Sequence, residues 1–356
     1  MSRKHICHLP RLLSCIALFS LGILSSVEAK IKIATLGDSL TDEYKFYPIR
    51  NTSENWVQFL AQSRSDQVSF GDYTEYEDRG ETRNLGYAQN WARSGARGQG
   101  VDVDGAGTLF TNQYFGSDKA PGLLTQEGGI QDMDVVTLFI GSNDYGAAVK
   151  AFTEQPYPYT TYNLPKLLDA ANEGILDALF KAIAEIRGEK PSTKIVVITP
   201  PDLNMTPRLT KMIQGAHQAI RASKKLPPET KPMLEYAVDN AALTLRQMNA
   251  DLAIEIQDFF EDVPNLAIIQ TNKVLSKLTK SKHYAGFPLN VEEGGETYTD
   301  LFTADNFHPG SLAHRIIAKK VVKAVNALYG ETVIDPILDE EIINESFEGF
   351  HHHDEL

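Results

Sequence analysis

Short apolar runs alternate along the chain with longer segments in which apolar residues recur every three or four positions. The strand-like runs span residues 31–36, 84–92, 134–140, 194–199 and 266–269. The segments with helical spacing span residues 54–61, 164–186, 229–257 and 310–328. Strands separated by helices in this way are typical of βαβ units, in which a parallel sheet is covered by helices on both faces. The pattern therefore predicts an α/β fold with a mainly parallel central sheet.

The first 29 residues form a separate segment. Arg3, Lys4 and Arg11 make its start basic, residues 12–24 are mostly apolar, and Val27-Glu28-Ala29 places small residues where a signal peptidase would cleave. This layout is typical of a secretory signal peptide. The alternative, a permanent membrane anchor, is disfavoured because the apolar run is shorter than the ~20 residues of a spanning helix.

Cleavage after Ala29 has a chemical consequence. The two cysteines of the chain, Cys7 and Cys15, both lie in the segment that would be removed. The mature protein would then have neither disulfides nor a thiol nucleophile or thiolate metal site. We expect an exported protein, secreted or periplasmic, that is stabilised by its core alone.

Residues 30–330 are predicted to form one domain, because no internal repeat and no Gly/Ser/Pro-rich linker divides them. Residues 331–356 form an acidic tail that we expect at the surface. The chain carries 34 Lys and Arg against 47 Asp and Glu residues, a net charge of −13. This acidic balance argues against nucleic-acid binding and against stable association with anionic membranes after signal cleavage.

Four short motifs point to chemistry. The first is Gly37-Asp38-Ser39-Leu40, directly after the first predicted strand. The carboxyl ends of strands are where open α/β sheets build their sites, and the glycine permits a sharp turn there. A serine hydroxyl becomes a useful nucleophile only when a nearby base accepts its proton.

The second motif can supply that base. Asp305-Asn306-Phe307-His308 places a carboxylate three residues before a histidine, just ahead of the last predicted helix. On a turn, this spacing lets the carboxylate orient the imidazole and stabilise its protonated form. Ser39, His308 and Asp305 are therefore the candidate nucleophile, base and orienting acid.

The third and fourth motifs can supply hydrogen-bond donors to an oxyanion. Gly95 lies in the loop after the second predicted strand, and its N–H is not shielded by a side chain. Gly141-Ser142-Asn143-Asp144 follows the next strand and offers the amide of Asn143; Asp144 is expected to bind loop backbone instead. Acyl transfer requires such preorganised donors.

Together, these four motifs resemble the four conserved blocks of the GDSL, or SGNH, hydrolases, in the order and at the places that this family has them. The resemblance spans nearly the whole mature chain. It implies a three-layer α/β/α sandwich of the SGNH-hydrolase, flavodoxin-like type. It also implies ester hydrolysis without a metal or another cofactor, with Ser39, His308 and Asp305 as the catalytic residues. The oxyanion hole would comprise the backbone N–H groups of Ser39 and Gly95 and the side chain of Asn143.

The chain is longer than simple members of this family, so we expect insertions at residues 66–84, 105–130, 200–235 and 280–300. Asp42 and Glu43 follow the nucleophile motif and either select a polar substrate or, as we favour, simply solvate the loop. No Gly-x-Ser-x-Gly motif supports an α/β-hydrolase elbow.

The sequence thus predicts a serine esterase acting on a small-molecule or carbohydrate ester, with O-acetyl groups on carbohydrate as the preferred substrate. A short-chain lipase or aryl esterase, an acyltransferase with the same triad, and a non-catalytic carbohydrate-binding protein remain alternatives. The last four residues, His353-Asp354-Glu355-Leu356, match an endoplasmic-reticulum retention signal, so location in that lumen is the alternative to export.

Overall fold

The computed structural model describes residues 29–75, 85–98, 110–117, 120–153 and 163–343. Its centre is a sheet of five strands in the order β2-β1-β7-β8-β9, and every neighbouring pair is parallel. The strands are β1 (Ile31–Gly37), β2 (Val68–Ser69), β7 (Val135–Phe139), β8 (Lys194–Ile198) and β9 (Leu266–Ile269). The predicted parallel α/β fold is therefore confirmed.

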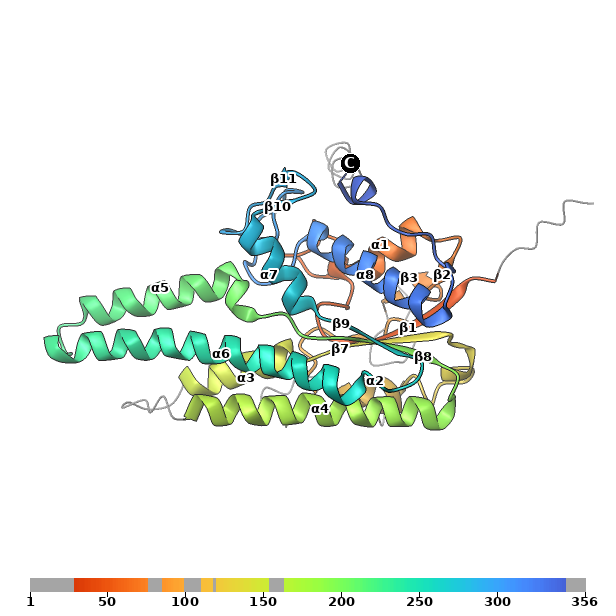
Figure 1. Cartoon of the computed structure of the whole chain (residues 1–356), viewed down its shortest axis with the longest axis horizontal. Helices are drawn as coiled ribbons and strands as arrows, with labels where there is room; N and C mark the ends of the chain where they lie inside the picture. Colours follow the sequence, from red (N-terminus) through yellow and green to blue (C-terminus); the bar gives the residue numbers. More distant parts are fainter. Residues whose placement is uncertain (1–28, 76–84, 99–109, 118–119, 154–162, 344–356) are drawn as a thin grey trace, which may run out of the picture.

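Helices cover both faces of the sheet (Figure 1). One face packs against α1 (Trp56–Ser63), α7 (Thr271–Ser281) and α8 (Ser311–Tyr329). The other packs against α2 (Phe110–Phe115), α3 (Ser142–Thr153), α4 (Asn163–Glu189) and α6 (Lys231–Phe260). Successive strand residues serve opposite cores: Ile33 lies in the first core and Ala34 in the second. Because both faces of the central strands are buried, their sequences are continuous apolar runs and do not alternate between apolar and polar residues.

A helical hairpin extends from one end of the sandwich (Figure 1). It consists of α5 (Pro207–Ala222), a turn with the short 3-10 helix η4 (Pro228–Thr230), and the first half of α6. Thr206 caps α5 and Pro207 opens it, an arrangement that favours a helix start. The hairpin covers much of the range 200–235, in which we expect an insertion.

The remaining elements are small. They are the 3-10 helices η1 (Tyr44–Phe46), η2 (Ile130–Asp132) and η3 (Leu203–Met205), and three two-stranded antiparallel pairs. The pairs are β3 (Tyr73–Thr74) with β4 (Gly86–Tyr87), β5 (Gly116–Ser117) with β6 (Ala120–Pro121), and β10 (His283–Tyr284) with β11 (Phe287–Pro288).

The prediction of a sheet strand at residues 84–92 was wrong. Within that range, β4 pairs with β3 outside the central sheet, and the edge strand β2 comes from residues 66–84, where we expected an insertion. The following residues nevertheless run beside β1. Asn90 forms a parallel bridge with Thr35, and Trp91 N donates to Thr35 O at 2.8 Å. An irregular segment thus occupies the place of a strand.

The start of the C-terminal tail departs from the prediction of a surface segment. Ile334, Ile337 and Ile342 are buried and belong to the core beneath α1 and α8. Glu341 pairs with Arg64 at 2.6 Å, whereas Asp335 and other acidic side chains of this stretch are exposed. We predicted a surface segment because the stretch is acidic, but its isoleucines pack into the core and attach it to the domain.

The predicted signal peptide up to residue 28, including both cysteines, and the C-terminal His353–Leu356 motif lie outside the described residues. Within the described ranges, no helix combines the length and the apolar content that crossing a bilayer requires.

Candidate active site

The end of β1 presents Ser39 in a tightly fixed turn. A side chain at Gly37 would place its Cβ 2.5 Å from Phe139 O, so only glycine fits there. The Gln113 side chain accepts from Gly37 N and donates to Gly37 O, both at 2.7 Å. Asp38 Oδ1 accepts from Leu40 N at 2.9 Å. These bonds hold the turn, and Ser39 itself is only 4% exposed.

The loop before α8 holds Asp305 and His308. Asp305 Oδ1 accepts hydrogen bonds from Thr303 Oγ1 and from the backbone N–H groups of Phe307 and His308, at 2.8–2.9 Å. Its other oxygen, Oδ2, lies 2.5 Å from His308 Nδ1. Asn306 adopts a left-handed conformation, φ 62°, which Asn tolerates better than most residues. The carboxylate thus organises the loop and orients the imidazole.

Ser39 and His308, 269 residues apart in sequence, meet at this edge of the sheet. His308 Nε2 lies 2.8 Å from Ser39 Oγ, so a continuous chain of hydrogen bonds joins Ser39, His308 and Asp305. In this arrangement the imidazole can accept the proton of the serine hydroxyl while its other nitrogen donates to the carboxylate.

The electrostatic environment keeps the imidazole neutral and the carboxylate charged. Burial lowers the pKa of His308, although the hydrogen bond that His308 donates to Asp305 opposes this, and the nearby charge of Arg50 lowers the pKa further. Burial alone would raise the pKa of Asp305, but the hydrogen bonds that it accepts from the side chain and backbone of His308 and from Phe307 N outweigh burial, and the pKa falls well below its usual range. A neutral imidazole is the form that accepts a proton.

Gly95 lies on the loop that runs beside β1. Arg93 N donates to Gly37 O at 3.0 Å, which aligns this loop with the turn that carries Ser39. Gly95 has φ +84°, a conformation that favours glycine. In the part of the chain that the structure describes, neither the Ser39 N–H nor the Gly95 N–H has a hydrogen-bond acceptor. Both amides are therefore free to bind a substrate oxygen.

Asn143 lies in the first turn of α3, beside the same loop. Its Nδ2 donates to Ala96 O at 2.9 Å, which leaves the second amide hydrogen available. Asp144 Oδ2 accepts from Gly98 N at 3.0 Å, as expected of a residue that binds loop backbone. The two side chains attach the Gly95 loop to the N-terminus of α3. All five predicted site residues thus lie at one edge of the sheet, four of them in loops and Asn143 in the first turn of α3.

Arg50 is a site residue that the sequence did not reveal. Its side chain is buried. The guanidinium carbon Cζ lies 4.8 Å from the centroid of the Tyr44 ring and 4.0 Å from that of the Tyr47 ring. The guanidinium donates to Ser39 O at 3.3 Å and to Ser94 Oγ at 3.1 Å. Arg50 therefore links the nucleophile turn to the residue before Gly95. No local motif marks this role, because it depends on the folding of a polar loop.

The carboxylates that follow the nucleophile motif do not solvate the loop, contrary to the interpretation that we favoured. Asp42 and Glu43 are both buried. Asp42 Oδ2 accepts from Ser94 N at 2.8 Å and from the hydroxyl of Tyr47. Glu43 Oε1 accepts from Tyr87 N at 2.9 Å. Asp42 thus binds the residue before Gly95, whereas Glu43 binds β4, which lies earlier in the chain.

A second histidine lies behind the first. His314 on α8 is fully buried, and its Nε2 lies 2.7 Å from the hydroxyl of Tyr44. The ring of Tyr44 packs edge-on against His308, with centroids 5.9 Å apart. Burial lowers the pKa of His314 to about 3. It is neutral at physiological pH and supports the packing behind His308.

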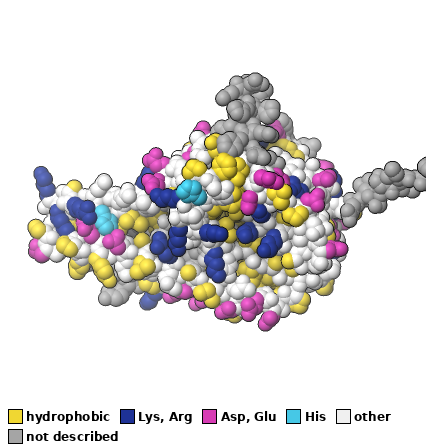
Figure 2. Space-filling model, turned by 45° about the horizontal axis from the view of Figure 1, so that its top comes forward, with side chains coloured by type: hydrophobic (Ala, Val, Ile, Leu, Met, Phe, Trp, Pro, Cys, Tyr) yellow, Lys and Arg dark blue, Asp and Glu magenta, His cyan; other side chains and the backbone are white. Residues whose placement is uncertain are grey.

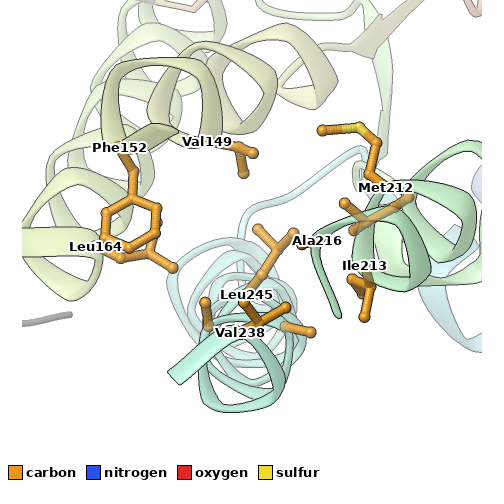
Figure 3. A pocket seen from close by; sticks show the side chains of 11 residues that line it. Val149, Phe152, Leu164, Met212, Ile213, Ala216, Val238 and Leu245 are labelled. Atoms are coloured by element: carbon orange, nitrogen blue, oxygen red, sulfur yellow. The ribbon is translucent and has the colours of Figure 1, made fainter. Parts of the chain in front are cut away.

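An apolar cavity of about 150 Å³ lies between α3, α4, α5 and α6. In Figure 3, Phe152, Leu164, Met212 and Leu245 approach it from these four helices. None of the five predicted site residues lines it. The cavity therefore belongs to the base of the hairpin and not to the hydrogen-bonded site. Within the described ranges, no cluster of three or more His, Cys, Asp or Glu residues is arranged to hold a metal ion.

Comparison with known proteins identifies the family. The model of the GDSL-like lipase/acylhydrolase family matches residues 33–321, most of the chain. This range includes both Ser39 and His308. No curated protein sequence matches the chain.

Solved structures with a similar chain path include a family two carbohydrate esterase from Clostridium thermocellum in complex with cellohexaose. It is 14% identical with a TM-score of 0.40; the match covers 84% of this chain but only 65% of the esterase chain. The lipase Lip_vut3 from a goat rumen metagenome is 12% identical with a TM-score of 0.40, over 85% of this chain and 100% of the lipase. These similarities are distant, and the family assignment rests on the family model.

Proposed function

The chain belongs to the GDSL-like lipase/acylhydrolase family and is a carboxylic ester hydrolase, and we propose that it works through an acyl intermediate on Ser39. The observation that carries this proposal is the unbroken chain of hydrogen bonds Ser39–His308–Asp305, with distances of 2.8 and 2.5 Å. A half-buried carboxylate, a neutral imidazole and a serine hydroxyl in this order form a nucleophile activated by a base.

In the proposed reaction, Ser39 Oγ attacks the carbonyl carbon of the ester and His308 Nε2 accepts the hydroxyl proton. The carbonyl oxygen becomes an oxyanion, to which the backbone N–H groups of Ser39 and Gly95 and the free amide hydrogen of Asn143 donate. Collapse of this intermediate breaks the bond to the alcohol oxygen, which takes the proton from His308. Water then attacks the acyl-serine by the same route, releasing the acid and restoring Ser39.

Asp305 remains ionised throughout this cycle. Its lowered pKa and its bond to His308 Nδ1 stabilise the imidazolium that forms at each proton transfer. Arg50 and Asp42 act as positioning residues, because they fix the loop that carries Gly95 relative to the turn that carries Ser39.

For the substrate, we propose an O-acyl ester on a carbohydrate, with O-acetyl as the simplest case. The polar surroundings of Ser39 and the separation of the apolar cavity from the site support a short acyl group. We also propose that the protein is exported after cleavage behind Ala29, because the basic start and apolar run precede the first strand, which begins at Ile31. The intact mass of protein recovered outside the cytoplasm tests this cleavage.

The deciding experiment is labelling with a fluorophosphonate, followed by intact mass measurement and peptide mapping. The wild-type protein should acquire one adduct, on Ser39, and Ser39→Ala should acquire none and lose ester turnover. Ser223→Ala, at the end of α5, is the matched control and should label normally. Folded wild-type protein that takes up no label would overturn the proposal in favour of a non-catalytic protein.

A further inference from the structure

A wide groove runs between α6 and α7, apart from the residues of the proposed triad. Its volume is about 810 Å³, and its lining includes Asp202, Asn204 and Met205. Its lining includes four basic side chains, Arg246, Lys273, Lys277 and Lys280. Amide and hydroxyl side chains, among them Asn204, Asn272 and Ser276, lie between them. The surface of the groove is therefore cationic and rich in hydrogen-bonding groups.

The charge of this groove contrasts with that of the whole molecule, whose net charge is −13. Helix α7 carries Lys273, Lys277 and Lys280 at positions i, i+4 and i+7, which places them on one face, and it contains no acidic residue. Across the groove, α6 contributes Arg246. Figure 2 shows Lys and Arg side chains gathered across the middle of this face, with Asp and Glu mostly toward its edges.

The acidic residues of α6 lie away from the groove. This helix contains five carboxylates, and none of them lines the groove: Glu235, Asp239, Asp251, Glu255 and Asp258. Among the residues that line it, Asp202 is the single acid, and its side chain is 5% exposed and lies 3.4 Å from Arg246. The three lysines of α7 form no ion pair in the described part of the chain. Four cations thus face the groove with one buried counter-charge.

The groove lies at the same edge of the sheet as Ser39. Asp202, which lines the groove, lies shortly after β8, and β8 is two strands from β1, a separation of about 10 Å. Asp202 also borders a small cavity with three residues next to the proposed catalytic groups, namely Leu40, Ser142 and Phe307. A ligand that extends along the groove toward Asp202 therefore approaches the site.

We propose that this groove binds an acidic polysaccharide, whose carboxylates pair with the lysines of α7 and whose hydroxyls bond to the amide and hydroxyl groups between them. The part of this inference that makes the polymer a substrate rests on the proposed ester hydrolysis. The enzyme would then act on acyl groups carried by a polyuronate chain, held at a distance from the reacting ester. A neutral glycan would lack the charge that this lining selects.

The test measures binding of polygalacturonate, of a neutral xylan and of a single-stranded oligonucleotide by titration calorimetry, on the Ser39→Ala protein so that no turnover interferes. The triple variant K273Q/K277Q/K280Q should bind polygalacturonate about tenfold or more weakly, and added salt should weaken binding to the parent protein. The matched control K224Q/K225Q/K323Q changes the net charge equally at exposed lysines outside the groove and should bind as the parent does.

Three results would overturn the inference: equal loss of binding in both triple variants, xylan bound as well as polygalacturonate, or the oligonucleotide bound more tightly than polygalacturonate.

Turnover is measured separately on otherwise wild-type protein. With K273Q/K277Q/K280Q, kcat/KM should fall for acetylated polygalacturonate and stay unchanged for p-nitrophenyl acetate. If Ser39 labels and the small ester is hydrolysed but polygalacturonate is not bound, this inference alone fails. If the polymer binds in the groove but Ser39 takes no label, the proposed function alone fails.

Discussion

The edge of the sheet around Ser39 and the hairpin of α5 and α6 differ in how their side chains are held. At the edge, buried and half-buried polar groups bond to partners far away in sequence: His308 to Ser39, Arg50 to Ser94, and Asn143 to Ala96. Along the hairpin, large apolar side chains such as Met233 and Tyr236 are 66% and 71% exposed. The cavity at the base of the hairpin is apolar.

This difference indicates which region controls the geometry of the reacting groups and which region contributes mainly to stability. A buried polar group must be paired, so each bond at the sheet edge fixes a neighbour, and a small change there spreads to the reacting atoms. The hairpin is stabilised by packing of one helix against another, which tolerates changes at exposed positions. We therefore expect substitutions at the edge to change turnover and substitutions at the hairpin base to change stability.

The strongest test of this contrast is Asp305→Asn. The variant keeps the shape of the side chain but removes the charge that stabilises the imidazolium and selects the tautomer of His308. We expect kcat/KM for p-nitrophenyl acetate to fall on the order of 10³–10⁴-fold. Asp335→Asn, which removes an exposed carboxylate, is the control and should retain full activity. A loss below tenfold in Asp305→Asn would remove Asp305 from the proposed mechanism.

Asn143→Ala should have the next largest effect. It removes one proposed oxyanion donor, and such a loss costs on the order of 10²–10³-fold in kcat. Because Asn143 also holds Ala96 O, the thermal midpoint is measured in parallel. Asn143→Asp keeps the shape of the side chain, but a carboxylate can donate neither to Ala96 O nor to the oxyanion, and its charge repels the oxyanion. If Asn143→Asp were as active as wild type, the side chain would not be a donor to the transition state.

Arg50 allows geometry and charge to be separated. Arg50→Lys keeps the positive charge but cannot bond to both Ser39 O and Ser94 Oγ, so we expect kcat to fall about ten- to a hundredfold. Arg50→Gln also removes the charge that lowers the pKa of His308.

The two Arg50 variants should therefore differ in the pH dependence of kcat/KM. His308 must be neutral to act as a base, and its lowered pKa keeps the wild type active into mildly acidic solution. With Arg50→Gln the pKa of His308 rises, so the acid limb moves to higher pH, while with Arg50→Lys it stays in place. A purely structural role for Arg50 would lower the rate in both variants without moving either limb.

Much of the fold could be predicted from the sequence because burial on both faces leaves a clear pattern. The strand predicted at residues 266–269 is β9, Leu266–Ile269, and the apolar run at 134–140 contains β7. The two-residue strand β2 was missed because it lies at the sheet edge in a polar segment and is too short to show a period. Ile334 and Ile337 were missed because the acidic residues around them dominate the composition.

The residues of the candidate site also fall into two groups: those that the sequence could predict and those that it could not. Ser39, Asp305 and His308 could be predicted because each lies in a short motif next to a recognisable element. Arg50 could not, because its contacts with Ser39 and Ser94 arise only when two loops distant in sequence fold together. Asp42 was noticed but misinterpreted, since its partner Ser94 lies 52 residues away. Local motifs predict which groups react, and tertiary contacts determine which groups position them.

The smallest effect on turnover is expected at the base of the hairpin. A substitution there tests whether stability can change while turnover does not. Leu245 is 3% exposed and lines the apolar cavity, so Leu245→Ala should destabilise the protein by about 2–5 kcal/mol in chemical denaturation. Leu243→Ala, two residues away on α6, alters a side chain that is 61% exposed and should change stability by less than about 0.5 kcal/mol. Both variants should hydrolyse p-nitrophenyl acetate at the wild-type rate below their unfolding transitions, because neither residue contacts the bonds that hold Ser39, Asn143 and His308. A loss of kcat/KM in folded Leu245→Ala comparable to that of Asn143→Ala would show that the hairpin base controls the geometry of the sheet edge, and the separation between shape and chemistry would fail.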